Sequence, residues 1–291
     1  MAKFGISVAL LTPFTETGAI DLAEIGAHAS RMVQAGASGV TLFGTTGEGA
    51  SIAASERDAA VKAVLDAGLS PDQLVLGVAE TSLGDAAARI AEGLALGVTR
   101  FLVLPPYYFK NNEDDGLFDW HMDLLAQTDD AAQLILYHIP QVTYVPLSVD
   151  LIGRLATAAP KRIIAIKDSS GSWENTEALL QQGLLPVLVG DERQLHRAAA
   201  LGAAGSICGV ANLYPERLVK LFETQTEDKE LSARVTAIVS GPVVPALKAL
   251  IAKQRGEAGW DRVRNPQRPL SETARAGLFS AIEAPAVDEP A

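Results

Sequence analysis

Three things are scarce in this sequence: cysteine, positive charge and long apolar runs. Cys208 is the single cysteine among 291 residues, which excludes an intramolecular disulfide framework. The chain has 24 Lys and Arg against 35 Asp and Glu, and the net charge of −11 argues against nucleic acid or an anionic membrane surface as the main partner. No uninterrupted apolar span reaches the length of a membrane helix, and the N-terminus lacks the pattern of a signal peptide. We therefore expect a soluble cytoplasmic protein, and the net charge leaves open a local site for a small anion.

The composition supplies a packed core. Hydrophobic residues make up 48% of the chain and charged residues 20%, which excludes a disordered protein. The length of 291 residues fits two average domains or one large α/β barrel. The order of the segments decides between these possibilities.

Short apolar runs alternate with longer amphipathic segments over the first 225 residues. The runs predicted as strands are 5–11, 39–43, 74–79, 100–104, 133–138, 163–167, 186–189 and 205–208. The segments predicted as helices are 21–34, with Asp21 as N-cap, and 55–65, 85–96, 116–126, 148–158, 174–182, 192–201 and 215–222. Eight such units predict an α/β fold, a closed parallel (β/α)8 TIM barrel. The alternative, an open doubly wound sheet, would carry a dinucleotide signature after the first strand, where Thr12-Pro13-Phe14 stands instead.

Beyond residue 225 the predicted strands stop. Three further helices are predicted at 231–239, 244–254 and 272–282, the first two separated by Gly241-Pro242. We therefore divide the chain into a barrel with the active site, residues 1–225, and a C-terminal helical appendix, residues 226–291. The tail, 284–291, is rich in Pro, Ala and acids, and we expect it to be frayed.

A lysine ends a strand of four consecutive apolar residues. Ile163-Ile164-Ala165-Ile166 is typical of a strand buried on both faces, and Lys167-Asp168-Ser169 follows directly. One interpretation is that Lys167 snorkels into water. The other is that desolvation favours its neutral amine, which can attack a carbonyl and form a Schiff base.

In a (β/α)8 barrel the loops after the strands build the active site, so the residues just beyond each strand are the candidates. The loop from Gly44 to Gly49 matches neither a Walker loop nor G-x-G-x-x-G, and it is either an ordinary tight turn or a cradle for a small carboxylate. Tyr107 and Tyr108 follow the fourth strand, and Tyr137 ends the fifth. Such tyrosines are either packing residues or phenols that relay protons to a carbinolamine.

Other polar residues have structural explanations. Asp191 either caps the helix that follows or contacts ligand. His28, His121 and His196 fall within predicted helices and are interpreted as structural or exposed, while His138 has no identifiable partner. No His, Asp and Glu cluster has metal-ligand spacing, which argues against a metal site and metal-dependent aldol chemistry. We expect no cofactor.

Taken in order, these motifs resemble the dihydrodipicolinate synthase and N-acetylneuraminate lyase family of class I pyruvate aldolases. The resemblance covers nearly the whole chain, including the helical appendix. It rests on Leu11-Thr12-Pro13-Phe14, the loop from Gly44 to Glu48, Tyr107-Tyr108 after two prolines, Tyr137-His138-Ile139-Pro140, Ile166-Lys167-Asp168 and Gly190-Asp191.

The resemblance implies catalytic roles for four residues. Lys167 falls on the Schiff-base lysine, and Tyr137 falls on the tyrosine that shuttles protons beside it. Thr46 falls on a residue that also links the tyrosines. Tyr108 falls on the tyrosine lent to a neighbouring subunit's site, which implies a homo-oligomer, either a dimer or a tetramer.

The resemblance also implies how a keto acid such as pyruvate is bound. Thr45 and Thr46 fall on the pair that holds the pyruvyl carboxylate, in the loop that contains Gly44 and Gly47. Ile207, in the eighth strand, falls on a position whose backbone faces the ligand.

The sequence departs from the synthases just after Pro140. Where they typically have Ser-Arg-Thr-Gly, whose arginine engages the carboxylate of the second substrate, this chain has Gln141-Val142-Thr143-Tyr144. Val142 cannot replace a bidentate guanidinium. Tyr144 replaces a glycine that the lyases usually keep as well, and we expect it to narrow the site or re-aim the loop. Poor use of aspartate semialdehyde follows, together with better activity on substrates whose distal end is neutral.

The predicted function is that of a class I aldolase or lyase acting on pyruvate or a 2-keto-3-deoxy acid through a Lys167 imine. The alternative within the same chemistry is a dihydrodipicolinate synthase that condenses pyruvate with aspartate semialdehyde. An alternative of another class is a non-catalytic keto-acid-binding barrel. The presence of both Lys167 and Tyr137 argues against it, since binding alone needs neither.

Overall fold

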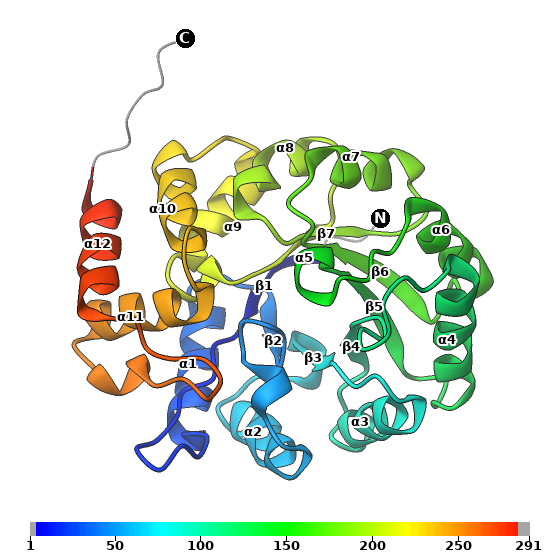
Figure 1. Cartoon of the computed structure of the whole chain (residues 1–291), viewed down its shortest axis with the longest axis horizontal. Coiled ribbons are helices and arrows are strands. Elements are labelled where there is room, and N and C mark those ends of the chain that lie inside the picture. The colour runs from blue at the N-terminus through cyan, green and yellow to red at the C-terminus, as the bar shows by residue number, and fades with distance from the viewer. Residues whose placement is uncertain (1–3, 285–291) are drawn as a thin grey trace.

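Eight parallel strands close into a barrel in the order in which they occur in the chain (Figure 1). The computed structural model describes residues 4–284. The strands are β1 (Gly5–Ala9), β2 (Gly39–Leu42), β3 (Leu74–Val78), β4 (Arg100–Val103), β5 (Gln133–His138), β6 (Ile163–Asp168), β7 (Val187–Val189) and β8 (Gly205–Cys208). The predicted TIM barrel is confirmed. The first strand ends two residues earlier than predicted, because the chain leaves the ladder where the loop toward Thr12 begins.

A helix follows each strand and lies outside the barrel (Figure 1). The outer helices are α1 (Leu22–Gln34), α2 (Ala54–Asp66), α3 (Leu83–Ala95), α4 (Asp114–Ala126), α6 (Val149–Ala158), α7 (Trp173–Gln182), α8 (Leu195–Ala200) and α9 (Pro215–Thr224). Asp21 caps α1 as predicted, its Oδ1 accepting from the N–H of Glu24 at 3.0 Å. Two details differ from the prediction. A one-turn helix, α5 (Pro140–Thr143), follows β5, and the helix predicted at 192–201 begins with a separate 3-10 turn, η3 (Glu192–Gln194).

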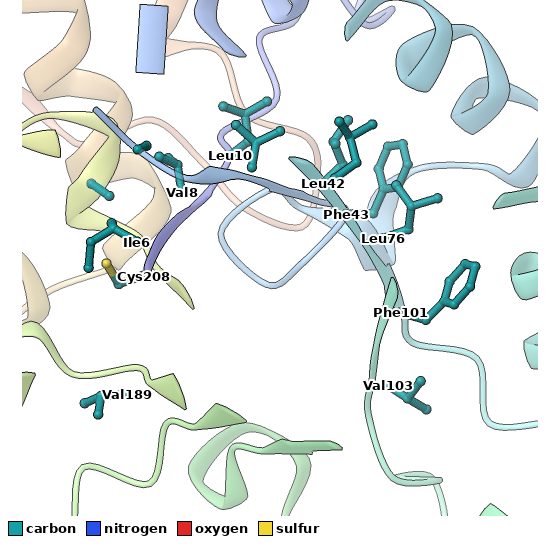
Figure 2. Close-up of a cluster of buried hydrophobic side chains, with 14 of the residues drawn as sticks. Ile6, Val8, Leu10, Leu42, Phe43, Leu76, Phe101, Val103, Val189 and Cys208 are labelled. Atoms are coloured by element: carbon teal, nitrogen blue, oxygen red, sulfur yellow. The ribbon is translucent and has the colours of Figure 1, made fainter. Parts of the chain in front are cut away.

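The core has an inner and an outer layer, because successive residues of a strand face opposite sides of the sheet. The inner layer fills the barrel and includes Ala9, Val75, Leu102, Ile135, Tyr137, Leu188 and Ile207. The outer layer lies between the strands and the helices. Figure 2 shows part of it, with Ile6, Val8, Leu10, Leu42, Phe43, Leu76, Phe101, Val103, Val189 and Cys208.

The β5–β6 ladder contains one register shift. Ile163 and Ala165 pair with consecutive residues of β5, which leaves Ile164 as an extra residue. Ile163 packs in the outer layer, and strict alternation from it would point Lys167 outward as well. The extra residue reverses the phase, so that Ala165 belongs to the inner layer and Lys167 pairs directly with Tyr137.

The C-terminal helices pack on one side of the barrel, next to α1 (Figure 1). They are α10 (Lys229–Val239), α11 (Val243–Arg255) and α12 (Glu272–Glu283), which confirms the predicted appendix. Arg255 of α11 pairs with Glu24 of α1 at 2.7 Å. The alternation of strands and helices ends with α9, and a domain boundary at residue 225 stays a prediction. Apart from Ala284, the tail predicted to fray lies outside the described residues.

Candidate active site

Lys167 and Tyr137 lie side by side at the carboxyl ends of β6 and β5. The Nζ of Lys167 lies 4.1 Å from the centroid of the Tyr137 ring. Lys167 is only 5% exposed, and no hydrogen bond or ion pair ties its amine to another residue in the described part of the chain. Both side chains line a cavity of about 400 Å³. The amine is therefore buried, unengaged and open to a small ligand.

The loop after β2 brings both predicted threonines to this cavity. The Oγ1 of Thr45 lies 3.2 Å from the hydroxyl of Tyr137. Thr46 packs against Gly209, where an added Cβ would come within 3.3 Å of the Thr46 hydroxyl. The link to the tyrosine was expected from Thr46; within residues 4–284 it is made by Thr45.

The two glycines expected to contact ligand have other surroundings. An added Cβ at Gly47 would lie 2.7 Å from the carbonyl oxygen of Leu10, and the hydroxyl of Thr12 donates to the Gly47 carbonyl at 2.7 Å. Gly47 is therefore needed where the loop packs on the end of β1. Gly44 lines a neighbouring cavity and not the one with the lysine. The structure thus assigns Gly47 to shaping the loop, and a contact of either glycine with ligand stays a prediction.

The loop after β7 supplies the polar wall of the cavity. Asp191, Glu192 and Arg193 all line it. Glu192 is buried, and its Oε1 accepts from the N–H of Val210 at 2.8 Å. Burial raises the pKa of Glu192, an effect that this hydrogen bond and the charge of Lys167 oppose. Sequence reasoning identified only Asp191, because its two neighbours fall inside the segment predicted as a helix.

Three histidines are held by hydrogen bonds within the protein. Nδ1 of His138 accepts from the N–H of Leu147 at 3.0 Å, and burial lowers the pKa of His138, an effect that the nearby Asp168 opposes. This bond is the partner that the sequence did not reveal. His28 and His121 are fully buried and hydrogen-bonded within the protein.

Three candidates after β4 and β5 are exposed. Val142 lines the cavity from α5 and is 52% exposed. Tyr144 ends α5 with φ at 55°, the left-handed conformation that favours glycine, and its ring is exposed outside the cavity. Tyr144 therefore does not narrow the cavity, and the other effect expected of it, a re-aimed loop, stays a prediction. Tyr108 is 74% exposed, packs edge-on against Phe109 and does not line the cavity of its own chain.

Ile207 lines the cavity from β8, and a contact of its backbone with ligand stays a prediction. A second cavity of about 320 Å³ lies across Thr45, Tyr137 and Val142, which line both. The lysine opens only into the first. Among residues 4–284, no group of three or more His, Cys, Asp and Glu is arranged to hold a metal ion, and no helix is long and apolar enough to cross a bilayer.

The model of the dihydrodipicolinate synthetase family matches residues 2–284. The chain belongs to this family. Its members are lyases of the class I aldolase type, and this chain is one of them.

Relatives of known name cover nearly the full length. A DapA-like lyase of Chloroflexus aurantiacus is 31% identical over 96% of both chains. A 4-hydroxy-tetrahydrodipicolinate synthase of Streptomyces coelicolor is 33% identical over 99% of this chain and 96% of its own length. Among solved structures, a dihydrodipicolinate synthase from Agrobacterium tumefaciens is 41% identical, with a TM-score of 0.94 over 97% of this chain and 99% of that one.

Proposed function

We propose that this lyase acts on pyruvate or a 2-keto-3-deoxy acid through an imine at Lys167. One observation carries the proposal: a buried, unengaged amine shares a cavity with the Tyr137 hydroxyl, which is itself bonded to Thr45. A lysine nucleophile needs a nearby group that handles protons, and the Tyr137 hydroxyl lines the same cavity.

The reaction follows from the placement of these groups. The Lys167 amine adds to the C2 carbonyl, and the carbinolamine loses water to give the imine. Tyr137 delivers and removes the protons of this step. In a cleavage, Tyr137 takes the proton of the C4 hydroxyl, C4 leaves as the carbonyl carbon of an aldehyde, and the protonated imine accepts the electron pair of the C3–C4 bond. In a dehydration, Tyr137 takes the C3 proton and the protonated imine accepts the electron pair of the C3–H bond. The resulting enamine takes a proton at C3 or expels hydroxide, and hydrolysis of the imine restores the lysine.

The substrate carboxylate is assigned to the loop after β2. Thr45 and Thr46 offer two hydroxyls, and the loop backbone offers N–H groups, at the side of the cavity next to Tyr137. Donors of this kind suit a carboxylate. Holding it there aligns the C2 carbonyl with the amine.

Two observations favour two different reactions. Val142 lines the cavity where the resemblance places an arginine, which favours cleavage or dehydration of a 2-keto-3-deoxy acid. The names of the relatives favour the second candidate, condensation of pyruvate with aspartate semialdehyde. A barrel that only binds keto acids would need neither the free amine nor the phenol.

Assembly into a dimer or tetramer is part of the proposal. Tyr108 does not line the cavity of its own chain and is exposed beside Phe109, an arrangement that suits insertion into the site of a second copy. A cytoplasmic location likewise stays a prediction.

Borohydride reduction in the presence of pyruvate tests the mechanism. We expect the mass of a reduced pyruvyl group on Lys167 alone. Lys167→Arg should abolish the adduct, because a guanidinium stays protonated. Lys161→Arg, an exposed lysine near the start of the same strand, is the matched control and should keep it. An adduct on another lysine, or none in an active preparation, contradicts the proposal.

A further inference from the structure

Two side chains lie on either side of the Lys167 strand at the cavity. Val142 follows β5 and Arg193 follows β7, and β5 and β7 are the two neighbours of β6. In the described part of the chain, the side chains that line the cavity include two cations, Lys167 and Arg193. The wall after β5 therefore lacks a cation, but the wall after β7 has one.

Arg193 is held in place by Asp191. Its Nε donates to Oδ1 of Asp191 at 2.9 Å, and its Nη2 donates to Oδ2 at 2.7 Å. Oδ1 also accepts the backbone N–H of Arg193 at 3.1 Å. Both carboxylate oxygens of Asp191 thus accept hydrogen bonds from Arg193, while the Nη1 and Nη2 atoms of the guanidinium keep N–H donors free. The only other contact of the group within residues 4–284 is a long one, 3.4 Å from Nη1 to the hydroxyl of Thr236.

The depth of the two cations differs. Lys167 is 5% exposed and lies at the bottom of the cavity, whereas the Arg193 side chain is 39% exposed and lies at the mouth. The mouth is otherwise largely apolar, with Val142, Val239 and Val243 exposed there. A ligand joined to the lysine at its keto carbon would extend its far end toward this mouth.

We propose that Arg193 binds an anionic group at the distal end of the substrate, so that the preferred substrates are keto acids with a second carboxylate. The free end of a guanidinium matches two carboxylate oxygens, and a clamped guanidinium loses little conformational entropy on binding. The proposal rests on the proposed imine function, because the imine fixes the other end of the substrate. It replaces the expectation of a neutral distal end, which considered position 142 alone.

The charges around Arg193 are compatible with a second carboxylate. The nearest acidic groups are Asp191, already bound to Arg193, and Glu192. The Glu192 carboxyl is buried, and its Oε1 is held by the N–H of Val210, while burial raises its pKa. Arg193 therefore supplies positive charge where the substrate ends.

The test compares two six-carbon 2-keto-3-deoxy acids, one ending in a carboxylate and one ending in a hydroxymethyl group. The readout is the concentration that gives half-maximal borohydride trapping at Lys167, which does not depend on the step after imine formation. The wild-type protein should trap the dicarboxylate at the lower concentration. Arg193→Gln should raise that concentration roughly tenfold to a hundredfold for the dicarboxylate, because it loses one charged hydrogen-bonded contact. For the monocarboxylate, the same variant should change the concentration less than about threefold.

Two further variants complete the test. Arg193→Lys keeps the charge and should retain part of the preference. Arg154→Gln is the matched control, because Arg154 also pairs with an aspartate at 2.7 Å and its side chain is 38% exposed, but it lies on α6 away from the cavity. It should change neither value.

The outcomes separate the two proposals. No trapping of pyruvate by the wild-type protein overturns the imine function. The role of Arg193 alone is overturned if pyruvate is trapped normally and the wild-type protein shows no preference for the dicarboxylate. It is also overturned if pyruvate is trapped normally and Arg193→Gln loses affinity equally for both acids. If Arg193→Gln fails to fold, as shown by lost pyruvate trapping, the wild-type preference and Arg193→Lys decide.

Discussion

The Nζ of Lys248 lies 2.5 Å from Oε1 of Glu48, and neither side chain is exposed. Lys248 also donates to the carbonyl of Arg262 at 2.7 Å, and the second oxygen of Glu48 accepts from the N–H of Arg264 at 2.8 Å. Burial lowers the pKa of Lys248 to about 8, an effect that Glu48 opposes. Glu48 ends the loop that carries Thr45 and Thr46, so the C-terminal helices hold the loop proposed to bind the carboxylate.

Removing the lysine should damage both stability and binding. Lys248→Met leaves the Glu48 carboxylate buried without a counter-charge, and we expect the free energy of unfolding to fall by about 3–5 kcal/mol. KM for pyruvate-containing substrates should rise more than kcat falls, because the loop is displaced. Denaturant titration and steady-state kinetics measure the two effects.

The controls use the same helix. Lys253→Met removes an exposed partner of Glu283 and should cost less than about 0.5 kcal/mol. The double variant Glu48→Gln, Lys248→Met should be more stable than Lys248→Met alone, since it no longer buries a lone charge. A double variant that is no more stable shows that the lysine acts through packing.

Two buried histidines should make the protein sensitive to acid. Burial, with the nearby charge of Arg255, lowers the pKa of His28 from 6.5 to about 3, and burial lowers that of His121 to about 4. Below pH 6.5 the unfolded chain therefore binds protons that the folded chain does not, and the free energy of unfolding falls as the pH falls. Each histidine contributes up to about 1.4 kcal/mol per pH unit in this window.

His121→Phe isolates one of these contributions. Nε2 of His121 has no hydrogen-bond partner among the described residues, so a ring of similar size loses only the bond to Leu117. Denaturation between pH 6.5 and 4.5 should show a slope about 1 kcal/mol per unit shallower than in the wild type, with a constant difference above pH 7.5. Parallel curves over the whole range contradict the assignment.

Use of aspartate semialdehyde as the partner of pyruvate should depend on Arg193. Val142 cannot bind the semialdehyde carboxylate, so Arg193→Gln should remove its charged hydrogen bond, worth about 1.5–3 kcal/mol, or roughly tenfold to a hundredfold in kcat/KM. Val142→Arg should recover part of this. The measurement is kcat/KM for the semialdehyde and for a 2-keto-3-deoxy acid in one preparation. Efficient use of the semialdehyde that is unchanged in Arg193→Gln would contradict this prediction.

Tyr108 should act in the site of a neighbouring subunit. Sedimentation at assay concentration should give a dimer or tetramer, and Tyr108→Phe should lower kcat without changing the assembly, because only the hydroxyl is lost. Tyr144→Phe, at a residue that is 71% exposed, is the control and should leave kcat unchanged. A monomer with full activity would refute this prediction.

The barrel and the lysine were predictable because each depends on local pattern. Eight apolar runs, each followed by an amphipathic segment, are compatible with few folds. The position of Lys167 at the end of a strand follows from the boundary of one apolar run. The direction in which Lys167 points was not predictable, since it depends on the extra residue Ile164, which no period-two pattern reveals. Arg193 was missed for a related reason, because its contribution depends on a 3-10 turn that replaces the start of a helix.

The register shift at Ile164 also limits how the strand can change. A strand that loses Ile164 would turn the amine from the barrel interior into the apolar layer under the helices. Such a chain would lose the amine from the cavity and bury it where no partner is available. In this strand the loss of one apolar residue that touches no substrate would therefore remove the chemistry as completely as the loss of Lys167 itself.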